Sequence, residues 1–318
     1  MTAPDAMAFQ AQTRCTRVRV PGKVILSGEH AVVYGNKALA CAIQRYADAN
    51  VQGVDQTGIH LSIVDFSIHQ HFSLLDLQRL GTETQTRHQC YQNGQVSLSK
   101  VVQTPAGFFA AALGASGITQ YLDDKQGLSI ELTMDLVPGG GMGSSAALVA
   151  AMLAAVSKYL GHPLTDQELI EKTTLSEQWQ HGKSSGLDPY VCIMGGLHEY
   201  QLGKAQSQSF KALPQSYLIT TGRPKSSTGD CVEWVREQNF DLGLWGQFEQ
   251  TEIRMLNALT IGDQQAAVKA VSSNHRLLQK IGVVPSAIST FIGTLESLGG
   301  AAKICGAGSI TGDQGGLL

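Results

Sequence analysis

The sequence lacks an apolar run long enough to cross a membrane, and it lacks an excess of positive charge. Its most apolar segment, residues 146–160, ends at Gly161, short of the ~18–20 residues that a spanning helix needs. The formal net charge is -3, so no positive field favours nucleic acid or an anionic membrane surface. We therefore expect neither nucleic acid nor a membrane as a partner, and a small-molecule ligand instead.

Paired cysteines are also missing. The six cysteines are scattered, and no two of them have the Cys-x-x-Cys spacing of a redox or zinc motif. Arg14, Arg17 and Arg19 occupy positions where a secretory signal peptide would need an apolar run. These features predict a reducing, cytoplasmic location.

No internal repeat is evident, and a length of 318 residues allows two domains. A new strand is expected at 217–221, so we place the domain boundary just before it, which gives domains of residues 1–213 and 214–318. Residues 51–100 are polar and rich in Gln, His, Ser and Thr. We expect short strands and long loops there.

The rest of the chain contains segments with the periodicity of strands and segments with that of helices. Strands are expected at 16–20, 24–26 and 128–134, and helices at 106–113, 146–160, 166–181, 230–237, 246–259 and 264–281. Thr165 is expected to cap the helix that follows it.

The segment PGGGMGSSAA at 138–147 lies between an expected strand and an expected helix. Its glycines are Gly139, Gly140, Gly141 and Gly143. Glycines permit positive φ and a close approach of backbone amides to an anion at the helix N-terminus. Ser144 and Ser145 can cap the helix, bind a phosphate or ligate Mg²⁺. A tight turn before a core helix explains the same pattern, so both interpretations stay open here.

No Gly-Lys-Ser/Thr follows these glycines, so the segment is not a Walker P-loop, and a lysine for a nucleotide must come from elsewhere. Residues 21–35, PGKVILSGEHAVVYG, place Lys23, Glu29 and His30 close together beside a strand. A hairpin with exposed charges is the alternative interpretation of these residues.

Two carboxylates and a second glycine-rich segment complete the set of candidates. Glu177 lies on the 166–181 helix, and Asp188 follows in a Ser/Gly-rich loop. Glu177 suits a metal ligand and Asp188 a base. The alternative is that Glu177 lies on a solvated helix face and that Asp188 forms an Asx-turn before proline. The glycines of KICGAGSITGDQGG at 303–316 indicate a loop that approaches the phosphate turn or the substrate, or else a flexible linker.

Four of these blocks, in this order, resemble the signature set of the GHMP kinase superfamily. They are PGKVILSGEHAVVYG, PGGGMGSSAA, GLDPYVCIMGG and KICGAGS, and they span nearly the whole chain. Residues 28–35 and 274–278 are most similar to the form found in mevalonate kinases. The resemblance implies a two-domain α+β fold with a ribosomal protein S5 domain 2-like N-terminal domain and a ferredoxin-like C-terminal domain. The active site would lie in the cleft between them.

The resemblance also implies roles for individual residues. Asp188 would accept the proton of the attacking hydroxyl, and Lys23 would keep Asp188 ionised and neutralise charge on the transferring phosphoryl group. Ser145 and Glu177 would hold Mg²⁺. Phosphoryl transfer needs mainly positioning and charge neutralisation, so these residue types suit the chemistry.

The remaining candidates would contact the two substrates. The ATP phosphates would bind at Gly139, Gly140, Gly141, Gly143, Ser144 and Ser145, and the acceptor near Glu29, His30, Gly306 and Ala307. One departure is that residues 306–313 read GAGSITGD, where the superfamily usually has Gly-Ala-Gly-Gly-Gly-Gly.

We therefore expect transfer of the γ-phosphate of ATP to the primary hydroxyl of mevalonate, giving 5-phosphomevalonate and ADP, with Mg²⁺ as cofactor. Phosphomevalonate, a sugar or an amino alcohol is the alternative acceptor. A catalytically silent metabolite-binding relative is the non-enzymatic alternative, which the joint presence of Lys23, Ser145, Glu177 and Asp188 disfavours. The resemblance is also compatible with a homodimer.

Overall fold

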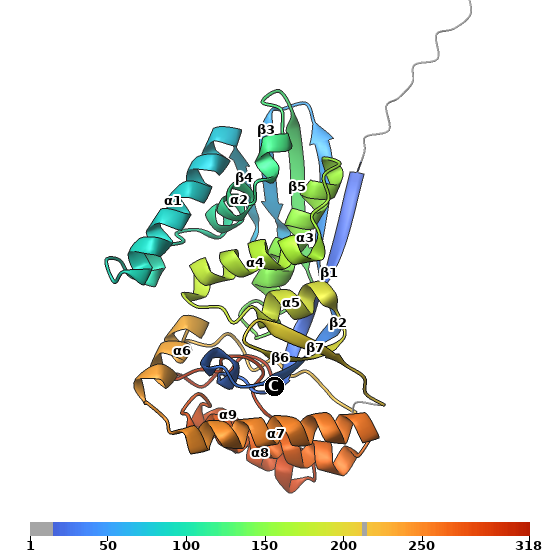
Figure 1. The fold of residues 1–318 in the computed structure, drawn as a ribbon, viewed down its shortest axis with the longest axis vertical. Helices are drawn as coiled ribbons and strands as arrows, with labels where there is room; N and C mark the ends of the chain where they lie inside the picture. The colour runs from blue at the N-terminus through green and yellow to red at the C-terminus, as the bar shows by residue number, and fades with distance from the viewer. Residues whose placement is uncertain (1–14, 212–214) are drawn as a thin grey trace, which may run out of the picture.

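A mixed seven-stranded sheet forms the frame of the molecule (Figure 1). The computed structural model describes residues 15–211 and 215–318. The strands are β1 (Cys15–Ser27), β2 (Ala38–Val54), β3 (Gly58–Ile63), β4 (Ile68–Phe72), β5 (Gly127–Met134), β6 (Leu197–Gln201) and β7 (Lys204–Gln208). Their order is β4-β3-β5-β2-β6-β7, with β1 paired to β2, and β3 and β5 run parallel. The strands expected at 16–20, 24–26 and 128–134 are confirmed.

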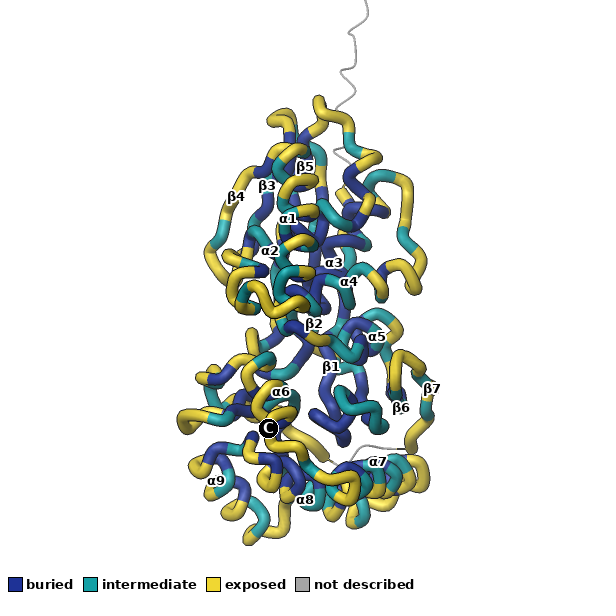
Figure 2. Tube along the Cα trace, turned by 60° about the vertical axis from the view of Figure 1, so that its left-hand side comes forward, coloured by how far each residue is buried: buried dark blue, intermediate teal, exposed yellow. Residues whose placement is uncertain are grey.

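Strand β2 extends from one end of the sheet to the other. Its residues Ala47–Val54 pair with β5, whereas Ala38–Cys41 pair with β6, and β1 lies antiparallel to it along nearly its whole length. Figure 2 shows β1 and β2 passing through the narrow middle of the molecule. The two ends of the molecule therefore share one continuous piece of sheet.

Helices cover the sheet around a core of small and aliphatic side chains. They are α1 (Leu74–Gln92), α2 (Pro105–Ala115), α3 (Ser144–Tyr159), α4 (Asp166–His181) and α5 (Leu187–Met194). Helix α3 packs against β1 and β2, and its many alanines let it approach the sheet closely while it is buried on most sides. Thr165 caps α4 in a capping box with Glu168, as expected.

Short strands and long loops were expected over residues 51–100. Strands β3 and β4 confirm the first part, whereas α1 shows that the expected loops are wrong there. This helix starts at a capping box formed by Ser73 and Asp76. Its buried stripe consists of Leu77, Gly81, Thr84 and His88. Only one of these four is a large apolar residue, so the helical period is present but carries almost no hydrophobic signal.

The C-terminal segment is helical, with α6 (Thr228–Glu237), α7 (Leu242–Ile261), α8 (Gln264–Lys280) and α9 (Ser286–Ser297). The first three were expected, whereas α9 and the short α5 were not. The strand expected at 217–221 is wrong, because its backbone pairs only with residues 316–318. Ile219 exchanges hydrogen bonds with Leu318, Thr221 donates to Gly316 O, and Thr220 forms an isolated bridge with Leu317. Cys305 also bridges Leu317, and in the described residues after β7 these short pairings represent the strands of the expected ferredoxin-like domain.

Tyr217, Leu218 and Ile219 are all exposed, so their apolar pattern has no sheet to cover. The expected boundary between residues 213 and 214 lies outside the described residues and stays a prediction. Within the described residues, no helix combines the length and hydropathy of a membrane span.

Helix α7 packs onto the lower end of the sheet through a buried carboxyl group. Glu252 is fully buried and faces Glu199 of β6, which is ion-paired with Lys37 at 3.0 Å. Burial, and then the charge of Glu199, raise the pKa of Glu252 to about 7, while Lys37 lowers it. The carboxyl group of Glu252 therefore gains or loses its proton near neutral pH.

Glu252→Gln is expected to change how stability depends on pH. With a raised pKa the folded state binds more protons than the unfolded state, so stability decreases as the pH rises from about 4.5 to about 7. The loss is on the order of 3 kcal/mol at most. The Glu252→Gln variant should not show this pH-dependent loss of stability, and at pH 8 it should be more stable than the wild-type protein. Urea unfolding at pH 5 and pH 8 measures this, with Glu237→Gln on exposed α6 as the control. If the unfolding free energy of the Glu252 variant depends on pH as that of the wild-type protein does, the raised pKa is not that of Glu252.

Candidate active site

A buried lysine and a carboxylate form the centre of the candidate site. Lys23 on β1 lies where the register with β2 shifts, and its side chain is only 2% exposed. Its Nζ is 3.0 Å from Asp188 Oδ2 and donates to the carbonyl of Gly141 at 3.0 Å. The expected neighbourhood of Lys23, Asp188 and the glycine turn is therefore present in the structure.

Asp188 lies in the first turn of α5, two residues after the N-cap Gly186, which has the left-handed conformation. The positive end of a helix stabilises a carboxylate there. Its side chain is 33% exposed, whereas Lys23 is buried behind it. One carboxylate oxygen is thus paired with Lys23 while the group as a whole stays open to a ligand.

The glycine turn connects β5 to α3, as expected. Gly139, Gly141 and Gly143 all have positive φ, and Gly143 is the N-cap of α3. Ser144 and Ser145 begin the helix. The backbone N–H of Lys23 donates to Met142 O at 2.9 Å, so β1 holds the turn from one side.

The C-terminal glycine-rich segment holds the turn from the other side. A Cβ on Gly141 would lie 2.1 Å from Cys305 O, and a Cβ on Gly306 would lie 2.8 Å from the Cα of Gly141. Two backbones that approach this closely leave no room for a side chain. The expected approach of this segment to the phosphate turn is therefore present.

Glu177 on α4 is buried beside this centre. Burial raises the pKa of its carboxyl group, and the charge of Asp188 raises it further, whereas His181, Ser145 and Lys23 lower it. Its Oε2 lies 3.6 Å from His181 Nε2, and its Oε1 has no hydrogen-bond partner among the described residues. A buried carboxylate oxygen without a partner is costly unless a cation or a donor satisfies it.

These groups fit Mg²⁺. A hydroxyl and a carboxylate are hard oxygen ligands, and Mg²⁺ usually completes its shell with waters and phosphate oxygens. The described residues contain no cluster of three or more His, Cys, Asp or Glu side chains arranged for a metal ion. A cation held by Ser145 and Glu177 would therefore need a bound phosphate.

Glu29 and His30 lie near the C-terminal segment, and both are buried. Glu29 is ion-paired with Lys303 and does not face solvent. His30 has φ 60°, and its Nε2 lies 2.9 Å from Ala307 O. Because a carbonyl only accepts, Nε2–H is the donor, and Nδ1 is left buried without a partner in the described part of the chain. Burial lowers the pKa of His30.

Several residues of this site were not among the candidates predicted from the sequence. His181 contacts Glu177, and Lys303 and Asn274 contact Glu29. Cys192 on α5 packs against the turn and donates weakly to Gly143 O at 3.9 Å. Asn274 and Lys303 both lie within segments that resemble the superfamily, which is the signal that could have found them.

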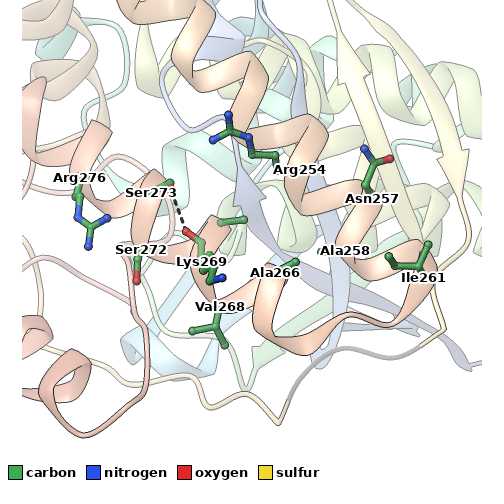
Figure 3. A pocket seen from close by; sticks show the side chains of 11 residues that line it. Arg254, Asn257, Ala258, Ile261, Ala266, Val268, Lys269, Ser272, Ser273 and Arg276 are labelled. Atoms are coloured by element: carbon green, nitrogen blue, oxygen red, sulfur yellow. Dashed lines mark hydrogen bonds between the residues drawn. The ribbon is translucent and has the colours of Figure 1, made fainter.

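A groove of about 640 Å³ lies elsewhere, between α7 and α8 (Figure 3). Arg254, Lys269 and Arg276 are among its lining residues, all of which belong to these two helices. The Lys23–Asp188 centre does not contribute to it.

The candidate site lies in a segment that is similar to a known family. Residues 106–196, which include the glycine turn, Glu177 and Asp188, match the family model described as "GHMP kinases N terminal domain". A mevalonate kinase of Pyrococcus horikoshii is 28% identical over 301 residues, which cover 91% of this chain and 84% of that protein. The part of the chain that holds the glycine turn is therefore similar to the N-terminal domain of GHMP kinases.

Solved structures show the same fold. The Methanococcus jannaschii mevalonate kinase matches with a TM-score of 0.76 at 20% identity, covering 97% of this chain and 90% of that one. The L. major mevalonate kinase in complex with R-mevalonate matches with a TM-score of 0.68 at 23% identity, covering 95% and 85%. The predicted GHMP kinase fold is confirmed.

Gly141→Ala is expected to separate the two glycine-rich segments of this protein. Its Cβ would collide with Cys305 O in a backbone conformation of φ +84°, so we expect at least tenfold weaker binding of an ATP analogue and a loss of ~2 kcal/mol or more in unfolding free energy. Calorimetric titration and urea unfolding measure both.

Gly139→Ala is the matched control for that variant. Its φ is +69°, but no atom lies within 4 Å of the added Cβ, so it reports backbone strain without a collision. Equal losses of unfolding free energy in the two variants would contradict the close approach of Cys305 as the cause.

Proposed function

We propose that this chain is an ATP-dependent mevalonate kinase, which transfers the γ-phosphate of ATP to the primary hydroxyl of mevalonate and releases ADP. The observation that carries the proposal is the 3.0 Å ion pair between Lys23 and Asp188 against the glycine turn. The similarity to named mevalonate kinases over 91% of the chain supports the choice of acceptor.

Asp188 acts on the acceptor hydroxyl in this proposal. Its carboxylate orients the hydroxyl and accepts its proton as the bond to phosphorus forms. Its partial exposure leaves room for the alcohol. Asp188 and Lys23 are therefore the proposed catalytic residues.

Lys23 and the N-terminus of α3 act on the phosphates. Lys23 lies next to the turn, so its charge and the amides at Gly143, Ser144 and Ser145 can neutralise the transferring phosphoryl group together. The lysine that a Walker P-loop carries within its glycine loop is supplied here by β1.

Ser145 and Glu177 would hold Mg²⁺, and the unpartnered Oε1 of Glu177 supports this. When bound, Mg²⁺ neutralises charge on the phosphate oxygens. We propose that the acceptor side is formed by His30, Gly306 and Ala307. A hydrogen bond joins His30 to Ala307 next to the glycine turn. A cytoplasmic location and a homodimer stay predictions.

Asp188→Asn is expected to lower kcat by 10²–10⁴-fold, because the amide cannot accept the proton and does not pair with Lys23. Binding of an ATP analogue should change by less than about threefold, since the glycine turn is intact. Steady-state ADP release and calorimetric titration measure the two effects, with exposed Asp166→Asn as the control. Full activity of the Asp188 variant would remove Asp188 from catalysis.

The acceptor is decided by ADP release from the wild-type protein with mevalonate, phosphomevalonate, galactose and homoserine. We expect kcat/KM for mevalonate to exceed that for each of the others by at least 10²-fold, because an acceptor that leaves buried polar groups unpaired is strongly disfavoured. Turnover of another acceptor alone would establish a different kinase of the superfamily. No turnover with any acceptor would favour a silent metabolite-binding relative.

A further inference from the structure

A buried ion pair joins the N-terminal and C-terminal parts of the chain behind the acceptor side. Lys303 is 6% exposed, and its Nζ donates to Ile25 O at 2.8 Å, to Ile304 O at 3.1 Å and to Glu29 Oε1. A lysine ammonium has three donors, so all of them are used. Lys303 thus has no donor left for a ligand.

The carboxylate of Glu29 is equally occupied. Its second oxygen, Oε2, accepts from Asn274 Nδ2 at 2.8 Å, and Asn274 Oδ1 lies 3.4 Å from Ser27 Oγ. Glu29, Asn274 and Ser27 are each no more than 1% exposed. The network therefore joins the end of β1, helix α8 and the segment that begins at Lys303, and Glu29 is a counter-ion inside it.

The two segments that the network joins are those that carry the acceptor-side residues. His30 follows Glu29 directly, and its Nε2 reaches Ala307 O at 2.9 Å. Cys305, two residues after Lys303, packs against the glycine turn at Gly141. A displacement of Lys303 relative to Glu29 would therefore move His30, Ala307 and the wall of the turn together.

We propose that Lys303, Glu29 and Asn274 form a buried clamp that positions His30 and residues 306–307 at the acceptor side of the cleft. Lys303 and Asn274 are then positioning residues, and Glu29 does not touch the acceptor. The proposal rests on the proposed function for the identity of the acceptor only. Buried ion pairs add little stability compared with apolar replacements, which is why a positional role accounts for this one better.

Asn274→Ala tests the clamp with the smallest disturbance, because it removes one hydrogen bond to Glu29 and leaves the charges paired. We expect the KM for mevalonate to rise about tenfold, while the KM for ATP changes by less than twofold. Asn257→Ala on exposed α7 is the matched control and should leave both constants unchanged. A loss of thermal stability with no change in the KM for mevalonate overturns the positional role.

The double variant Lys303→Met/Glu29→Gln removes both charges at once, so it leaves no unpaired buried charge. It should fold and show at least a 30-fold lower kcat/KM for mevalonate. Lys269→Met, on the exposed surface of α8, is its control. Retention of wild-type kcat/KM in the folded double variant overturns the clamp.

Hydrogen exchange of the ligand-free protein separates the clamp from the proposed function. In Asn274→Ala, amides of residues 30–31 and 304–308 should exchange at least tenfold faster, while those of α1 keep their wild-type rates. Unchanged exchange at both segments overturns the clamp whatever the acceptor is. Absence of mevalonate turnover by the wild-type protein, with the exchange result as expected, overturns only the proposed function.

Discussion

The site depends on placing the charge of Lys23 in a position where water does not reach it. A buried ammonium is stable only when nearby acceptors replace its hydration, and Asp188 and the carbonyl of Gly141 do so. The glycine turn, the start of α5 and strand β1 must therefore meet at one point. The chemistry proposed for the site follows from that meeting, because Asp188 is proposed to act on the acceptor and the glycine turn on the phosphates.

The parts of the site that the sequence predicts are those whose chemistry is local. The turn at 139–143 needs glycine because its backbone adopts positive φ, and that requirement is visible in the residues themselves. Asp188 was also recognisable, since it lies in a segment of characteristic composition. Asn274 is different, because its hydrogen bond to Glu29, 245 positions away in the sequence, exists only in the folded chain.

The errors in the predicted fold have the same origin. Helix α1 buries glycine, threonine and histidine on its inner side, so hydrophobicity alone does not reveal its period. The segment 217–219 shows the opposite case, because its side chains are apolar and yet exposed. A pattern of side chains indicates a strand only if another strand is available to pair with it, and pairing is a property of the whole chain.

The pairing of β2 is interrupted at its middle. Its residues 47–54 pair with β5 and 38–41 with β6, whereas residues 43–45 pair with no strand, because the register with β1 shifts between Pro21 and Lys23. The strand that joins the two ends of the sheet is therefore least restrained by backbone hydrogen bonds beside Lys23. The position of the ammonium group depends there on Asp188 and the carbonyl of Gly141, so the charge pair helps to hold together the part of the sheet from which it extends.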